Sequence, residues 1–145
     1  MTVIRYWEDV TVGDALPSYT LEITTSLIVD QVSGSQDYNL MHHDTAFARA
    51  QGAPDAYVNT GFIEAFLARS VTGWMGDTGW MKKLRLEMRR FNALGDTIKV
   101  AGKVTGKRIE DGEHLVDCDV WVENNRDGIS VPGGAVVRLP SKTAA

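Results

Sequence analysis

The chain has 145 residues, of which 43% are hydrophobic and 23% charged, so one compact globular domain is expected and disordered or fibrous classes are excluded. The net charge of −4 argues against nonspecific nucleic-acid binding, which needs a basic surface. No apolar run approaches the roughly 18 residues that span a bilayer, and no signal-peptide pattern opens the sequence. The single cysteine, Cys118, excludes an internal disulfide and a cysteine-based metal cluster. We therefore expect a cytoplasmic protein.

The first half of the sequence predicts mainly helices. The expected elements are a strand at residues 19–25 and helices at 26–33, 44–51 and 59–72. In the last of these, apolar residues recur every four positions, and Asn59 or Thr60 can cap its start. Because this segment is apolar on most sides, we expect a buried helix.

The second half alternates between apolar and polar residues, which is the period of a strand with one wet face. Such runs lie at residues 83–89, 97–104, 116–122 and 135–139. The pairs Asp111-Gly112 and Asp127-Gly128 interrupt this pattern, as hairpin turns do. The spacers are too short for crossover helices, so the predicted sheet is antiparallel.

Together these elements predict an α+β domain at residues 1–140, in which a long antiparallel sheet wraps around one central helix, followed by a flexible tail at 141–145. This arrangement is the hot-dog fold. Its edge strands stay open, and edge pairing in a dimer is one way to cover them. A chain of this size also leaves little room for a deep private pocket, which favours a site shared between two subunits.

Titratable side chains gather in the segment before the central helix. Asp37 and His42 stand five residues apart, so they converge only if the chain turns between them, and Asn39 is a natural turn residue. If they converge, they can hold one water between them. The imidazole can then take a proton from it while the carboxyl group manages a second proton. From spacing alone, a helix-capping aspartate and two surface histidines remain the alternative.

Several stretches match a known family in the same order. They are residues 6–14, the motif Asp37-x-Asn39-x-x-His42-x-Asp44, residues 91–97 with their Gly-Asp-Thr end, and the Asn-rich residues 122–128. The ordered set, which covers roughly residues 5 to 140, resembles the MaoC-like acyl-CoA dehydratases of the (R)-specific enoyl-CoA hydratase group. In that family the central motif runs Asp-x-Asn-Pro-(Leu/Ile)-His-x-Asp.

The resemblance implies that Asp37 and His42 are the catalytic pair. They would hold the water that adds to C3 of a trans-2-enoyl-CoA thioester, giving a (3R)-hydroxyacyl-CoA, or act in the reverse dehydration. The implied substrate-binding residues are Asn39, Tyr57, Asn59, Thr60 and Gly61. Neither a metal nor an organic cofactor is implied, since coenzyme A is part of the substrate.

The chain departs from the family pattern at three places. Leu40 replaces the proline of the motif, and Gln36 replaces the glycine before the aspartate. Asn59 and Thr60 stand where relatives have His-Gly at the start of the central helix, a region whose backbone N–H groups help to bind the thioester oxygen. A threonine keeps the N–H but restricts the approach of a substrate, so this departure bears on the oxyanion hole.

A narrower resemblance concerns residues 42–44, 50–52, 55–59 and 71–74. These look like the small catalytic subunit of actinobacterial hydratases that act on steroid side chains. That resemblance implies a bulky acyl group and a heteromer with a larger MaoC-like chain, while a homodimer remains open. The alternative functions are a hot-dog acyl-CoA thioesterase and a noncatalytic acyl-CoA-binding subunit. Neither a nucleic acid nor a membrane is expected as a partner.

Overall fold

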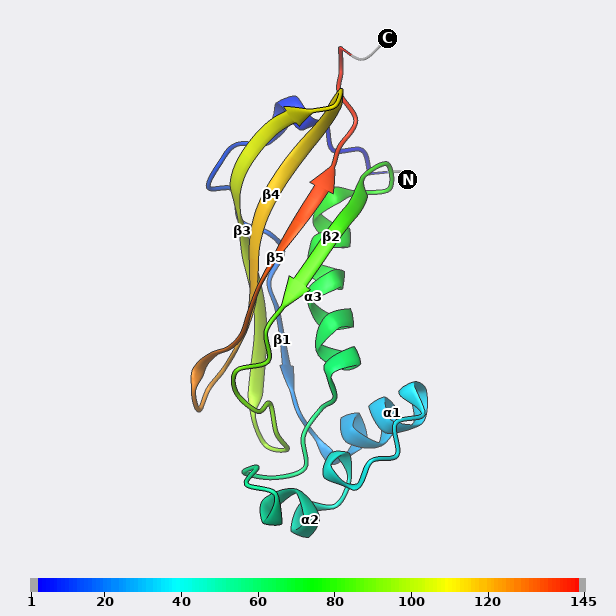
Figure 1. Ribbon diagram of the computed structural model, residues 1–145, viewed down its shortest axis with the longest axis vertical. Helices are drawn as coiled ribbons and strands as arrows, with labels where there is room; N and C mark the ends of the chain where they lie inside the picture. Colours follow the sequence, from blue (N-terminus) through cyan, green and yellow to red (C-terminus); the bar gives the residue numbers. More distant parts are fainter. Residues whose placement is uncertain (1–2, 144–145) are drawn as a thin grey trace.

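The computed structural model describes residues 3–143 and contains a five-stranded antiparallel sheet curled around the helix α3 (Figure 1). In chain order the elements are η1 (Trp7–Asp9), β1 (Tyr19–Glu22), α1 (Thr25–Ser35), η2 (Leu40–His42), α2 (Thr45–Ala50), α3 (Thr60–Met75), β2 (Trp80–Leu86), β3 (Thr97–Glu110), β4 (Glu113–Asn124) and β5 (Gly128–Arg138). The strand order is β1-β3-β4-β5-β2, so β1 and β2 form the edges. The predicted α+β hot-dog fold is confirmed.

The core lies between the sheet and one side of α3. On β3, Ile98 and Val100 are buried while the alternating Lys99 is exposed, which is the pattern of a strand with one covered face. On α3, Ile63 and Leu67 follow each other at a spacing of four and are fully buried. Removing a leucine side chain from such a site costs about 2–5 kcal/mol, so this packing fixes the position of α3.

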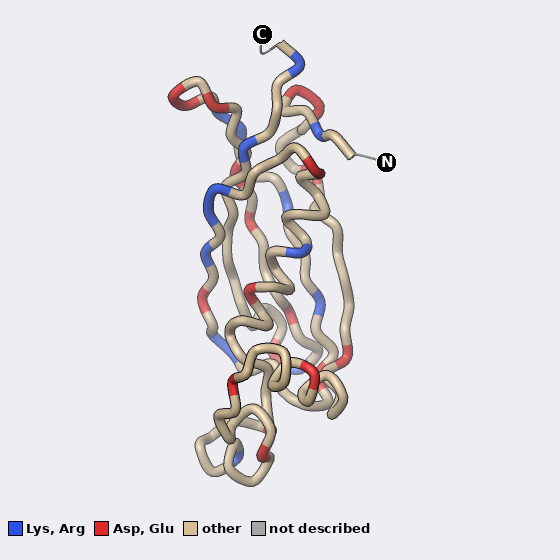
Figure 2. The backbone as a smooth tube through the Cα atoms, turned by 90° about the vertical axis from the view of Figure 1, so that its right-hand side faces the viewer, with Lys and Arg blue, Asp and Glu red and all other residues tan. Residues whose placement is uncertain are grey.

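The opposite side of α3 is not covered by the described residues. Gly61, Glu64, Ala65, Arg69 and Thr72 are all exposed, and Figure 2 views the helix from this side, with the strands curling behind it. The expectation of a helix buried on most sides is therefore right for one side only. The reason is geometric: a single curled sheet can cover one side of a helix, and a second layer is needed for the other.

Element boundaries differ from the sequence-based expectation where local hydrogen bonds replace the regular pattern. β2 ends at Leu86, and beyond it the N–H groups of Arg89 and Arg90 share one acceptor, Ser130 O (3.0 Å each), in place of regular strand pairing. β1 ends at Glu22 because Thr24 instead caps α1, accepting from Leu27 N at 3.2 Å. β3 runs past residue 104 to Glu110 because a bulge lets its pairing with β4 continue.

The two ends of the molecule differ. The chain termini lie at one end, and α1 and α2 gather at the other, where α3 begins (Figure 1). In the expected flexible tail, Ser141 Oγ donates to Glu8 Oε1 (2.5 Å) and Lys142 N donates to Glu8 Oε2 (3.1 Å), while residues 144–145 lie outside the described part of the chain. None of the helices in residues 3–143 combines the length and apolar character that crossing a membrane requires.

Candidate active site

A turn between α1 and η2 brings the two motif side chains together. α1 ends at Ser35, and the C-cap residue Gln36 has a φ of 57°, in the left-handed region that favours glycine. The Gln36 side chain donates to Ser33 O (2.6 Å), which ties it to the last turn of the helix. A non-glycine residue in this conformation costs about 1–2 kcal/mol. The glycine-to-glutamine departure is therefore accommodated without loss of the turn.

Asn39 shapes the next part of this turn. Its N–H approaches Asp37 Oδ1 at 3.4 Å, and its side chain accepts from Met41 N at 3.3 Å, which caps η2. The Asn39 side chain is exposed and does not line the cavity described below. The implied role of Asn39 in substrate binding stays a prediction. The structure supports its role as a turn residue, because its side-chain oxygen accepts from the backbone of η2.

His42 and Asp37 meet at the end of this turn. His42 Nε2 lies 3.2 Å from Asp37 Oδ2, and the His42 side chain is 8% exposed against 40% for Asp37. His42 Nδ1 lies 2.9 Å from the carbonyl oxygen of Tyr57. A carbonyl only accepts, so Nδ1 carries a proton. The other ring nitrogen, Nε2, is then the one that faces the Asp37 carboxyl group.

Asn59 joins the start of α3 to this pair. Its Oδ1 accepts from Phe62 N (2.9 Å), which caps the helix as predicted. Its Nδ2 donates to Asp37 Oδ2 (3.2 Å) and to Ser35 Oγ (3.0 Å). Asn59 itself is buried, and its own N–H donates to Gln31 Oε1 at 3.3 Å. The Asn59 side chain therefore both caps the start of α3 and orients the Asp37 carboxylate.

A cavity of about 440 Å³ lies in front of the pair. Its lining residues are Asp37, Met41, His42, Tyr57, Val58, Asn59, Thr60, Gly61, Met88, Arg89, Arg90 and Phe91. With the exception of Asn39, every residue that the sequence implied for the site is in this lining. The segment from Met88 to Phe91 was missed. The alternation predicts a strand that continues to residue 89. It breaks at Arg90, a charged residue where an apolar one is expected, and this break is the signal that could have found the segment.

The first turn of α3 presents donors to this cavity. Asn59 satisfies the Phe62 N–H, and the N–H groups of Thr60 and Gly61 find no acceptor within residues 3–143. A Cβ added at Gly61 would meet only Asn59 Oδ1, at 3.7 Å, which is ordinary contact. The protein itself therefore does not need a glycine there, and the missing side chain leaves room on the cavity side of the helix.

Tyr57 forms the wall beside the imidazole. Its ring lies edge-on to His42 with centroids 5.2 Å apart, and 4.8 Å from the ring of Phe91. The Tyr57 hydroxyl donates to Met41 Sδ (2.7 Å), and burial raises the pKa of the phenol. Tyr57 therefore stays neutral, contributes an apolar wall, and supplies the carbonyl that holds His42.

The neighbouring polar residues have structural roles. Asp44 caps α2 by accepting from Phe47 N at 2.9 Å. His43 is exposed, with Nε2 3.1 Å from Tyr38 O, and it is not part of the cavity lining. Across residues 3–143, no group of three or more histidine, cysteine or acidic side chains is arranged to hold a metal ion.

The comparison with protein-family models finds no match for this chain. Among curated proteins, the beta subunit of 3-oxo-4,17-pregnadiene-20-carboxyl-CoA hydratase from Mycobacterium tuberculosis is 32% identical over 101 residues, which are 70% of this chain and 77% of that protein. Among solved structures, a chain of the ChsH1-ChsH2 complex from Mycobacterium tuberculosis is 29% identical, with a TM-score of 0.78 over 89% of this chain and 98% of that one. The MaoC-like dehydratase from Rhodospirillum rubrum, 18% identical, shares the fold with a TM-score of 0.79 over 97% and 99%.

Proposed function

Because the chain belongs to the MaoC-like dehydratase family, whose members include hydratases, we propose that it adds water to a trans-2-enoyl-CoA thioester to give a (3R)-hydroxyacyl-CoA, or catalyses the reverse reaction. The observation that carries the proposal is the 3.2 Å contact between His42 Nε2 and Asp37 Oδ2 at the wall of a cavity that also receives the start of α3. The reaction needs only proton transfer and charge stabilisation, so it requires neither a metal nor an organic cofactor.

The proposed water-binding position lies on the cavity side of the contact between Asp37 and His42, within reach of both side chains. The Tyr57 carbonyl holds the proton on Nδ1, which leaves Nε2 as the basic nitrogen of a neutral imidazole. In hydration, the water oxygen forms a bond to C3, and one water proton passes to this acid–base pair. The C2=C3 electron pair moves toward the thioester oxygen and then returns to C2. C2 takes up a proton from the acid–base pair, which replaces the one accepted from water and restores the pair.

The N–H groups of Thr60 and Gly61 are the proposed donors to the thioester oxygen. That oxygen gains negative charge as water adds, and donors fixed in position are most effective where charge develops. Both residues line the cavity, and both belong to the positive end of a 16-residue helix. Thr60, which replaces the family's glycine, keeps its backbone N–H, so the number of N–H donors at the start of α3 is unchanged.

We further propose a bulky, steroid-type acyl group and a second MaoC-like chain as partner. A groove of about 450 Å³ runs between α3 and β2 and shares Gly61 with the cavity; its other lining residues are Glu64, Ala65, Ala68, Leu84 and Leu86. Small side chains on α3 leave space for a broad ligand, and β2 is an edge strand. The similarity to a steroid-type CoA hydratase subunit and to a chain of a two-component complex supports this choice over a homodimer.

The test is a panel of enoyl-CoA substrates from short-chain to steroid-sized, assayed with the chain alone and with the product of its genomic neighbour. Loss of the enoyl-thioester ultraviolet band without release of thiol is the expected result. Asp37→Asn and His42→Ala should lower turnover by about two to four orders of magnitude, whereas His43→Ala, on the neighbouring exposed histidine, should leave turnover unchanged.

Other outcomes would contradict the proposal. Release of free CoA thiol would indicate a thioesterase. Binding of acyl-CoA without turnover, alone and with the partner, would indicate a noncatalytic subunit. Near-normal rates in folded Asp37→Asn and His42→Ala proteins would remove the acid–base pair from the mechanism.

A further inference from the structure

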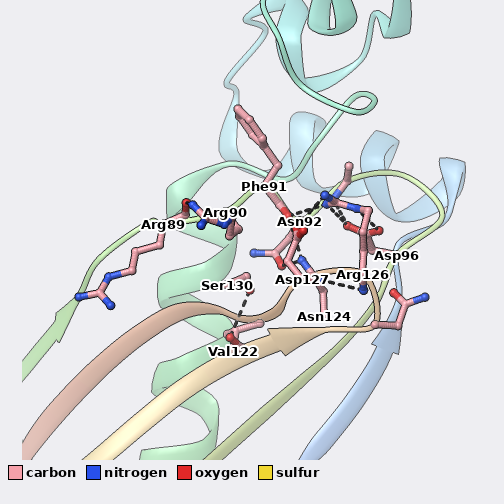
Figure 3. A network of polar contacts seen from close by, with 12 residues as sticks. Arg89, Arg90, Phe91, Asn92, Asp96, Val122, Asn124, Arg126, Asp127 and Ser130 are labelled. Carbon is pink, nitrogen blue, oxygen red and sulfur yellow. Dashed lines mark hydrogen bonds and ion pairs between the residues drawn. The ribbon is translucent and has the colours of Figure 1, made fainter.

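A polar clamp at the β4–β5 turn holds the loop that carries Phe91 (Figure 3). The Arg126 guanidinium binds both carboxylate oxygens of Asp96, with Nε 3.2 Å from Oδ1 and Nη2 2.9 Å from Oδ2. The same Nη2 donates to the Phe91 carbonyl oxygen at 2.9 Å. Its hydrogen bonds to Asp96 raise the pKa of Arg126. The guanidinium is therefore charged, and it joins the turn to both ends of the segment 91–96.

Asn124 completes this clamp. Its Nδ2 donates to Phe91 O (3.0 Å) and to Asn92 Oδ1 (3.1 Å), while its Oδ1 accepts from the N–H groups of Arg126 and Asp127 at the turn. Asn92 and Asn124 are both buried. The Phe91 carbonyl thus receives two donors from the turn. In Figure 3 the Phe91 ring extends to the side away from the guanidinium, toward the cavity that it lines.

The clamped segment in turn supports the residues around His42. Asn92 O accepts from Val58 N (3.1 Å), Ala56 O accepts from Leu94 N (2.8 Å), and Tyr57 forms a bridge with Ala93. The segments 56–58 and 92–94 therefore lie side by side. A displacement of the clamped segment moves the Tyr57 carbonyl, which is the acceptor that fixes His42 Nδ1.

We propose that Arg126 is a positioning residue for the site: by clamping Phe91 and Asp96 to the β4–β5 turn, it fixes the Tyr57 carbonyl and through it the His42 imidazole. The role in catalysis rests on the hydratase function proposed above. The role in orienting His42 does not, because it concerns only contacts within the chain. Arg126 touches neither the cavity nor the reacting atoms, so it acts through the backbone of the clamped loop.

The kinetic test compares Arg126→Gln, Arg126→Lys and the control Arg108→Gln. Arg108 is a matched residue: it pairs with two carboxylates, Glu110 and Asp117, and its side chain is 39% exposed against 36% for Arg126. It lies on β3 beside the start of β4, whereas Arg126 follows the end of β4. Arg126→Gln should lower kcat by about 10- to 100-fold, the effect of misplacing a catalytic group, with KM changed less than threefold. Arg126→Lys keeps the charge but has all its donors on one nitrogen, so it should recover part of that loss. Arg108→Gln should show no loss.

A spectroscopic test reads His42 directly. In ¹⁵N NMR of the neutral imidazole, the wild-type chain and Arg108→Gln should show His42 protonated at Nδ1, and Arg126→Gln should show a measurable Nε2–H population. An unchanged His42 tautomer in Arg126→Gln, below its melting temperature, overturns the proposal even if activity is lost. If wild type fails to turn over enoyl-CoA substrates, the hydratase function fails, and the tautomer comparison still decides the orienting role. Should Arg126→Gln not fold, Arg126→Lys carries the same comparison, because a lysine cannot bind two carboxylate oxygens and Phe91 O together.

Discussion

Asn59 joins two properties that substitution can separate: the stability of α3 and the orientation of Asp37. Its Oδ1 caps the helix, and its Nδ2 donates to Asp37 Oδ2. Serine keeps a capping oxygen but has no group that reaches Asp37 in the same way. Alanine loses both interactions. The pair Asn59→Ser and Asn59→Ala therefore tests the two roles against each other.

The magnitudes follow from the contacts. Loss of an N-cap costs about 1 kcal/mol. For a chain of 145 residues, the usual unfolding entropy converts this into a fall in Tm of about 3 °C. The Asp37 side chain is 40% exposed, so water replaces much of the lost Nδ2 hydrogen bond and its own effect on stability is small. We expect Asn59→Ser to melt within about 2 °C of wild type and Asn59→Ala about 3 °C or more below it.

Activity should not follow this order. Both variants release Asp37 from its donor, so both should lose about 10-fold or more in kcat, the effect of a poorly held catalytic group. Circular dichroism melts give the first quantity, and disappearance of the enoyl-thioester band gives the second. The reasoning is refuted if Asn59→Ser has wild-type kcat while Asn59→Ala loses both stability and rate, because Asn59 would then be a helix cap alone.

Three further predictions concern separate contacts. Gly61→Ala should hold or raise Tm, since alanine favours a helix by about 0.5–1 kcal/mol. It should nevertheless lower kcat/KM, because its methyl group enters the cavity. A fall in Tm together with the fall in kcat/KM would contradict this reasoning. Asp44→Ala should lower the free energy of unfolding by about 1 kcal/mol through loss of the α2 cap, with Asp44→Asn as the control that retains it, and kcat should not change. Burial raises the pKa of the Cys118 thiol from 9.0 to about 12. The contribution of the buried neutral thiol to the free energy of unfolding is therefore complete below pH 9 and is lost between pH 9 and 12. Iodoacetamide should label Cys118 only at the rate at which the chain unfolds. Rapid labelling of the folded chain at pH 8 would contradict the burial of this side chain.

The parts of the site that the sequence predicted are those that depend on short-range chemistry. Asp37 and His42 converge because Asn39 and the left-handed Gln36 turn the chain locally. The capping role of Asn59 follows from its position before an apolar periodic segment. In the same way, alternation and turn residues predicted the antiparallel strands, because each strand has one covered face.

The remaining parts depend on contacts between distant segments. Arg126 and Asn124, more than 30 residues later, bind the carbonyl of Phe91, which lines the cavity. No local pattern encodes this. At Gln36 and Thr60 the side chain differs from the family pattern, but the backbone keeps the turn at Gln36 and the N–H group at Thr60. The side-chain oxygen of Asn39 caps η2, and the substrate role that the family resemblance implies for Asn39 stays a prediction.

The exposed side of α3 has a consequence for every melting experiment described above. Any chain that covers Gly61, Ala65 and Thr72 binds the folded helix and not the unfolded one. By mass action, the apparent Tm of this protein then rises with the concentration of that chain, whether it is a second copy or a different subunit. Melting temperatures of variants are therefore comparable only at one fixed protein concentration. A titration of Tm against the concentration of the covering chain measures its affinity for the exposed side of α3.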